Sequence, residues 1–387
     1  MTRNRIQTAF IFLSVTFLAG TFLRASEVFK IPVEYRNFVH AHSHIGFLGW
    51  FTFIIYGLTE KYFLTKNLSE KTSQTLNLSY ILLVISCLGM LFSFPVQGYR
   101  FMSILFSSLH ILATYIISAC MLKNIKSDMA RNLKIFLFII FGFQFLASIG
   151  PWSLGPIMTS SLRNTHWFQN IVYSYLHFLY HGFILSFVIF LSFVYPSETK
   201  KNTSKISIGF FLILISNFFT LSLSFLWMKP PMIFNLLAAT GAILFLYGLF
   251  LIGKNHFKEY SKWKKIIYAI FIAKGIFMLT GAVPAIANQV AASRFLLLTY
   301  MHFTFLISLV LPFLVITLVK IKKQAANQTI IAFITLSLLL LIIMILPYLV
   351  PKTILANLLI YQYSLFIVSA LLFIWSVGIL WLTPKQE

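Results

Sequence analysis

The chain has 387 residues, of which 59% are hydrophobic and only 10% are charged. Soluble domains carry about 25% charged residues, so this composition excludes an ordinary soluble protein and indicates an integral membrane protein. The net charge is +22, but Lys and Arg are concentrated in both tails and in alternate loops. That asymmetry is typical of cytoplasmic segments of membrane proteins and predicts attraction to anionic lipid, not nucleic-acid binding.

Apolar runs of about 20 residues are long enough to cross a bilayer as helices. Twelve such runs are expected, at 6–24, 38–58, 76–94, 101–122, 133–150, 171–195, 206–228, 232–252, 266–286, 295–319, 329–350 and 354–382. The loops between them are too short to fold as a soluble domain. We therefore predict an all-α membrane protein in which residues 1–387 form one multi-pass bundle. Both termini are expected in the cytoplasm, and the membrane is expected to be a bacterial inner membrane.

Charged residues within these runs are scarce. All eight acidic residues fall in the expected loops or tails. A transporter or proton pump that depends on carboxylates within the membrane is therefore not indicated. Lys274 is the only clear charge inside a run. It either pairs with an anionic group, takes part in proton entry, or extends to the surface or a backbone carbonyl.

Histidines are the most informative polar residues, because an imidazole inside a membrane span is costly and is commonly a metal ligand. Seven lie near the expected outer ends of spans: His40, His42, His44, His110, His177, His181 and His302. A spacing of four places two pairs each on one helix face, whereas His42 faces another way. Several histidines at one depth favour a shared site over isolated interhelical hydrogen bonds. Partners for their second ring nitrogens are expected among Ser43, Tyr175, Tyr180 and Thr304.

The runs at 38–58, 171–195 and 295–319 are the second, sixth and tenth spans, so they recur at every fourth span. Each places an apolar residue before a histidine, at His40, His177 and His302. This weak repeat predicts three four-helix units around a pseudo-threefold axis. The cysteines, Cys87 and Cys120, match no metal or haem-attachment spacing and are expected to be packing residues.

The stretch from His40-Ala41-His42 to Leu48-Gly49-Trp50 resembles subunit I of the haem-copper oxidase superfamily, which includes terminal oxidases and nitric oxide reductases. The resemblance extends over the bundle through its helix count and its histidine-bearing helices. It implies that His40, His42 or His44 pairs with His302 as the axial ligands of a low-spin haem. It also implies that His177 or His181 binds copper or iron. His110, an extra histidine in the fourth span, is expected as a further metal ligand from its depth among the other histidines.

The chain departs from that family at two places. Adjacent histidines are expected near the end of the seventh span, where this chain has Trp227-Met228-Lys229-Pro230-Pro231. Two histidines spaced by one residue are expected in the tenth span, where Tyr300 and Thr304 flank His302. These departures place a second haem and a three-histidine copper site in question, and no catalytic residue is assigned.

Three functions remain open at this level. The first is a haem-binding electron-transfer subunit or a divergent oxidoreductase acting on oxygen or nitric oxide. It would receive electrons from a donor protein or a quinol and could associate with other membrane subunits. The second is a transporter or channel whose histidines bind a metal or a small substrate. The third is a haem or copper assembly or sensing factor.

Overall fold

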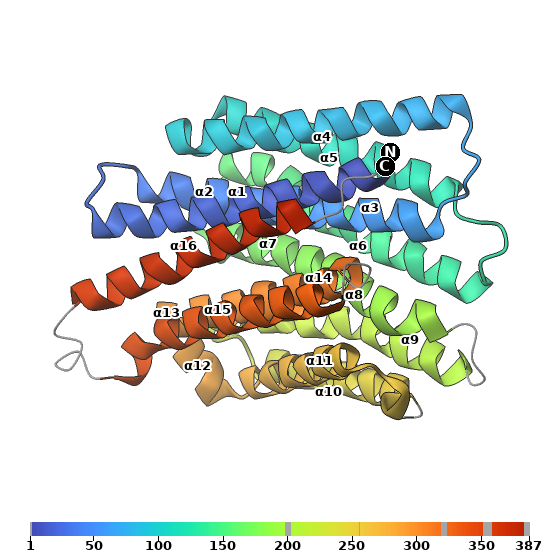
Figure 1. The fold of residues 1–387 in the computed structure, drawn as a ribbon. Helices are drawn as coiled ribbons and strands as arrows, with labels where there is room; N and C mark the ends of the chain where they lie inside the picture. Colours follow the sequence, from blue (N-terminus) through green and yellow to red (C-terminus); the bar gives the residue numbers. More distant parts are fainter. Residues whose placement is uncertain (1, 198–202, 255, 319–322, 351–357, 383–387) are drawn as a thin grey trace. The chain divides into compact units, whose positions relative to one another are not determined.

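The structure is a computed structural model that describes residues 2–197, 203–254, 256–318, 323–350 and 358–382. Apart from one isolated bridge between Leu64 and Ile125, the described residues form helices and connecting loops. Eleven of these helices are long and apolar enough to cross a membrane, or up to twelve if one bent pair counts as a single span. The prediction of an all-α, multi-pass membrane protein is confirmed (Figure 1).

The bent pair corrects one of the expected spans. Residues 266–286 were expected to form one helix, but α11 (Lys262–Gly281) ends and α12 (Pro284–Ala292) begins after a bend of 97°. Val283 between them is extended, with φ −72° and ψ 125°. A residue that precedes proline disfavours the helical conformation, and proline is well suited to the first turn of a helix. Pro284 therefore explains the break.

Several spans are longer than their apolar runs, because polar caps start the helices earlier. The run at 76–94 lies within α4 (Glu70–Gln97), whose N-cap hydroxyl of Ser69 accepts a hydrogen bond from the Thr72 backbone N–H. Ser and Thr at this position satisfy donors that the first helical turn leaves unpaired. The first residues of the last expected span, 354–357, lie outside the described residues.

The chain divides into two compact units. Unit 1 comprises Met1–Met129 and Thr317–Glu387, and unit 2 comprises Ala130–Ile316. Unit 1 contains α1 (Thr2–Val28), α2 (Tyr35–His44), η1 (Ile45–Phe51), α3 (Thr52–Phe63), α4, α5 (Phe101–Lys123), α15 (Lys323–Leu349) and α16 (Leu358–Leu382). The main helices of unit 2 are α6 (Arg131–Met158), α7 (His166–His177), η3 (Phe178–Leu185), α8 (Ser186–Ile189), η4 (Phe190–Val194), α9 (Thr203–Thr220), η6 (Leu221–Met228), α10 (Ile233–Gly253), α11, α12, α13 (Arg294–His302), η8 (Phe303–Val310) and α14 (Leu311–Leu318).

Unit 1 joins the first and last spans of the chain. The Trp375 ring of α16 lies 4.7 Å from the Phe333 ring of α15 and 6.4 Å from the Phe17 ring of α1. Its indole N–H donates to the Thr329 carbonyl at 3.0 Å. A tryptophan that is partly buried needs such an acceptor for its polar edge. This indole therefore connects helices that are distant in sequence but adjacent in unit 1 (Figure 1).

The central span of unit 2 is His166–Val194. In its most apolar stretch, 94% of the residues are buried. Beside it, α9 and α10 approach closely at two glycines. A Cβ atom on Gly209 would lie 2.6 Å from the Gly248 carbonyl oxygen. Small residues at helix crossings allow backbones to approach in this way. The central span is therefore shielded from lipid and can carry polar side chains.

An ion pair in unit 1 corrects the expectation that every acidic residue lies outside the spans. Glu60 lies within α3, its side chain is 10% exposed, and its carboxylate accepts a hydrogen bond from Arg5, whose side chain is 7% exposed. The guanidinium also donates to Asn77 at 2.8 Å and lies 3.7 Å from the centre of the Tyr80 ring. Lys274 is therefore not the only charge within the spans. The opposite charges neutralise each other, as burial requires.

Gly98 is required at the C-terminus of α4. Its φ of 61° and ψ of −143° are accessible almost only to glycine, and a Cβ atom there would lie 2.6 Å from Asn37 Oδ1. We expect Gly98→Ala to lower the free energy of unfolding by about 1–3 kcal/mol. Denaturant unfolding monitored by tryptophan fluorescence measures this. Gly142→Ala in α6, where no atom lies within 4 Å of the added Cβ, is the matched control. Equal losses in the two variants would contradict the expectation.

Candidate functional site

The same backbone feature follows a histidine in three helices. At His44, α2 changes to the π-helix η1; at His177, α7 changes to η3; and at His302, α13 changes to η8. π-Helical turns are rare and occur frequently at functional sites. These are the three helices that share the apolar-histidine pattern in the sequence. The structure therefore adds a second common feature to that repeat.

The widened turns leave backbone carbonyls that side chains can reach. In η1 the Leu48 carbonyl accepts hydrogen bonds from His110 Nε2 at 3.0 Å and from Cys87 Sγ at 3.7 Å. After η3, the Ser186 hydroxyl donates to the His181 carbonyl, five residues earlier, at 3.2 Å. His110 is 2% exposed and Cys87 is fully buried. Both residues thus hold the π-turn of η1 against α4 and α5.

Ring orientation separates the three histidines of α2. A carbonyl oxygen only accepts, so the ring nitrogen that faces it carries the proton. His42 Nδ1 donates to the Thr16 carbonyl at 3.0 Å, and His44 Nδ1 donates to the His40 carbonyl at 2.8 Å. Each Nε2 then has a lone pair. Tyr99 donates to that of His44 at 3.3 Å, whereas that of His42 has no hydrogen-bond partner among the described residues.

The surroundings of these rings differ as well. The His44 ring lies 4.3 Å from the Phe94 ring, and the His40 ring lies edge-on to Tyr99 at 4.7 Å. His42 instead faces α1, where a Cβ atom on Gly20 would lie 3.1 Å from His42 Cε1. The prediction that His40 and His44 share a face and that His42 points elsewhere is confirmed. His42 is the one of the three whose ring is both fixed and open at Nε2.

Histidines of unit 2 are fixed in the same manner. His302 Nδ1 donates to the Leu298 carbonyl and His177 Nε2 donates to the Asn217 carbonyl, both at 2.8 Å. In these tautomers the other ring nitrogen, His302 Nε2 or His177 Nδ1, is an acceptor. A ring nitrogen held by a carbonyl is the usual arrangement of a ligand histidine, because it sets the tautomer and the ring orientation.

The prediction that the hydroxyls of Ser43 and Thr304 pair with histidine rings is wrong. The Ser43 hydroxyl donates to the Val39 carbonyl at 2.8 Å, and the Thr304 hydroxyl accepts from Lys274. Backbone carbonyls take their place. Every residue supplies a carbonyl, so residue types in the sequence carry no signal for this kind of partner.

His177 and His181 form a buried pair. Their rings are stacked with centroids 5.0 Å apart, and the residues are 2% and 4% exposed. The Tyr180 ring lies 4.7 Å from that of His181 and 5.5 Å from that of Phe305 in η8. Within the described part of the chain, the ring nitrogens of His181 make no hydrogen bond. The pair therefore offers nitrogen donors in an apolar, aromatic environment.

Lys274 belongs to the same cluster. It is fully buried and donates to Thr304 Oγ1 at 3.1 Å and to the Tyr300 hydroxyl at 3.3 Å. Phe305, the residue after Thr304, lies 5.5 Å from the Tyr180 ring, which lies beside His181. A lysine that extends to the surface would not be fully buried. The hydrogen-bond partners of Lys274 among the described residues are hydroxyls, so the structure supports neither the surface nor the carbonyl alternative.

The predicted ligand histidines are distributed over both units. His40, His42, His44 and His110 lie in unit 1, and His177, His181 and His302 lie in unit 2. Among the described residues, no group of three His, Cys, Asp or Glu side chains is arranged to hold a metal ion. The predicted metal ligands thus include one close pair, His177 and His181.

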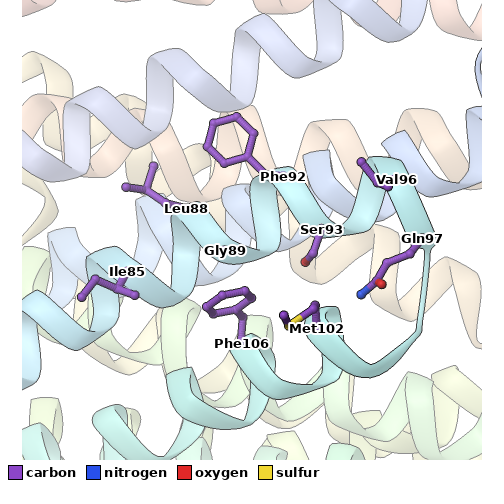
Figure 2. A pocket seen from close by; sticks show the side chains of 9 residues that line it. All are labelled: Ile85, Leu88, Gly89, Phe92, Ser93, Val96, Gln97, Met102 and Phe106. Atoms are coloured by element: carbon purple, nitrogen blue, oxygen red, sulfur yellow. The ribbon is translucent and has the colours of Figure 1, made fainter.

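A groove of about 560 Å³ lies between α4 and α5 (Figure 2). Its lining is mainly apolar: Ile85, Leu88, Gly89, Phe92, Ser93, Val96, Gln97, Met102 and Phe106. Phe92 is 69% exposed and Val96 is 85% exposed, as expected for a surface that faces lipid acyl chains. No histidine lines this groove. It is a feature of the outer face of unit 1 and not part of the histidine site.

Comparison with protein-family models and with curated proteins finds no match to this chain. The geometry of the histidines, and the residues that fix them, therefore carry the functional argument.

Proposed function

We propose that this chain is a haem-binding integral membrane protein similar to subunit I of the haem-copper oxidase superfamily. It would act in electron transfer or as a divergent oxidoreductase for oxygen or nitric oxide. The observation that carries the proposal is the histidine followed by a π-helix in three separate spans, at His44, His177 and His302. Such a repeated departure from α-helical geometry at a potential ligand is difficult to explain by packing alone.

The ring geometry supports particular ligands for a bis-histidine haem. An axial histidine needs one nitrogen for the iron and a partner for the other. His42 and His302 meet this requirement through the Thr16 and Leu298 carbonyls. His40 makes no ring hydrogen bond among the described residues, and His44 Nε2 already accepts from Tyr99. On the geometry within each unit, we propose His42 of unit 1 and His302 of unit 2 as axial ligands; that the two histidines serve one haem is what the resemblance implies.

A bound haem would supply a reversible one-electron change at its iron. The residues of this chain hold the ligand rings in one tautomer and surround them with apolar side chains, which exclude water and influence the potential. His177 and His181 would bind copper or iron as a second centre. Electrons would come from a donor protein or a quinol, and the chain could associate with further membrane subunits.

The proposal is tested by the absorption spectrum and metal content of the purified full-length protein. We expect haem in the preparation and a sharp α band in the dithionite-reduced minus oxidised spectrum. His166→Ala, at the exposed start of α7, is the control and should leave the spectrum unchanged. A bound transition metal without haem would contradict the proposal and favour a transporter or channel. Haem without turnover of oxygen or nitric oxide would favour an electron-transfer, assembly or sensing role.

A further inference from the structure

Lys274 has a fully buried amino group for which the described residues of unit 2 provide no counter-charge. The only carboxylate in the described part of that unit is Glu259, which lies in a loop, is 52% exposed and faces His256 at 3.8 Å. An ammonium group removed from water without a partner costs several kcal/mol. The Arg5–Glu60 pair of unit 1 shows the usual solution, a buried opposite charge. In the described part of unit 2, no buried carboxylate lies beside Lys274.

The cluster also has more hydrogen-bond donors than acceptors. An ammonium group has three N–H donors, of which two are directed at Tyr300 and Thr304. Those two hydroxyls accept from Lys274 and also hydrogen-bond to each other, so one of their two hydrogens has a partner and the other remains a donor. Farther along η8, the buried hydroxyl of Ser308 has no partner. Water could accept these hydrogen bonds but would leave the charge unbalanced. A bound anion would satisfy both requirements.

We propose that Lys274, Tyr300 and Thr304 form a binding site for a singly charged carboxylate. The single positive charge is matched by one negative charge, and two carboxylate oxygens can accept from the ammonium group and the hydroxyls. The carboxylate belongs either to a small free acid or to the acidic group of a larger bound molecule. The proposal does not depend on haem binding.

The test uses the full-length protein in detergent micelles and two measurements. Equilibrium dialysis with radiolabelled formate measures binding of a free carboxylate, and mass spectrometry of the denatured protein identifies any acid that co-purifies. We expect about one carboxylate per chain, and formate affinity lowered by about tenfold or more in Lys274→Met. Lys274→Arg should retain binding because it keeps the charge. Lys262→Met, at the exposed start of the same helix, is the matched control.

Thr304→Val keeps the charge and the fold while removing one hydroxyl, and it should weaken formate binding about threefold to tenfold. Saturable formate binding by the wild type identifies a free acid as the occupant. A co-purified acid that is missing from Lys274→Met identifies a larger bound molecule. The proposal is overturned if the wild type neither binds formate nor releases an acid. It is also overturned if folded Lys274→Met or Thr304→Val binds formate as the wild type does.

Discussion

Replacing Arg5 with methionine is expected to lower the free energy of unfolding by about 3–5 kcal/mol. The change removes the partner of Glu60 and leaves a carboxylate whose side chain is only 10% exposed. It also removes the hydrogen bond to Asn77 and the contact with the Tyr80 ring. Denaturant unfolding of the purified protein in micelles, followed by tryptophan fluorescence, measures the loss.

Two further variants make this result specific to the buried pair. The double variant Arg5→Met/Glu60→Met should recover most of the loss, because a buried ion pair can often be replaced by apolar side chains at little cost. Arg24→Met breaks a longer and more exposed pair, Arg24–Glu27 at 3.5 Å, and should cost less than about 1 kcal/mol. Equal losses for Arg5→Met and Arg24→Met would show that the Arg5–Glu60 pair is not a buried stabilising contact.

Replacing His302 with alanine is expected to abolish the haem α band, because the variant lacks the Nε2 lone pair while the helix remains intact. Among the histidines of α2, His42→Ala should have the same effect. His40→Ala should retain the haem, since its ring makes no fixing hydrogen bond among the described residues. Haem content and the reduced spectrum of each purified variant measure these outcomes.

Imidazole added to His42→Ala or His302→Ala distinguishes a lost ligand from a misfolded protein. A cavity at the ligand position should admit imidazole and restore at least part of the α band. If His44→Ala loses haem while His42→Ala retains it, the assignment within α2 is wrong. If neither His42→Ala nor His302→Ala changes the spectrum, these residues are not the ligands.

The spans could be predicted from sequence because a run of apolar residues is a local property. The residues at which the spans end could not be predicted, because they depend on contacts between distant segments. The second span was expected to end at residue 58, where Thr59, Glu60 and Lys61 introduce polarity. Instead α3 continues to Phe63, and Arg5 from the first span neutralises Glu60. By contrast, the break before Pro284 has a local signal in the proline itself.

The candidate site was partly accessible from sequence. The spacing of His40 and His44 identified a shared face, and the unusual position of Lys274 marked it as a functional candidate. The π-helices could not be anticipated, because no residue type in the sequence specifies them. They occur in the three helices that the weak sequence repeat selected. The pseudo-threefold arrangement of four-helix units itself remains a prediction.

The central claim is that a haem is bound axially by two histidines of this chain. A low-temperature electron paramagnetic resonance spectrum of the oxidised, purified protein tests it most directly. If two histidines are the axial ligands, we expect a low-spin ferric haem signal of the bis-imidazole type. This signal should be lost in His302→Ala and retained in His166→Ala. A preparation without haem iron, or one with only a high-spin signal that His302→Ala leaves unchanged, would contradict it.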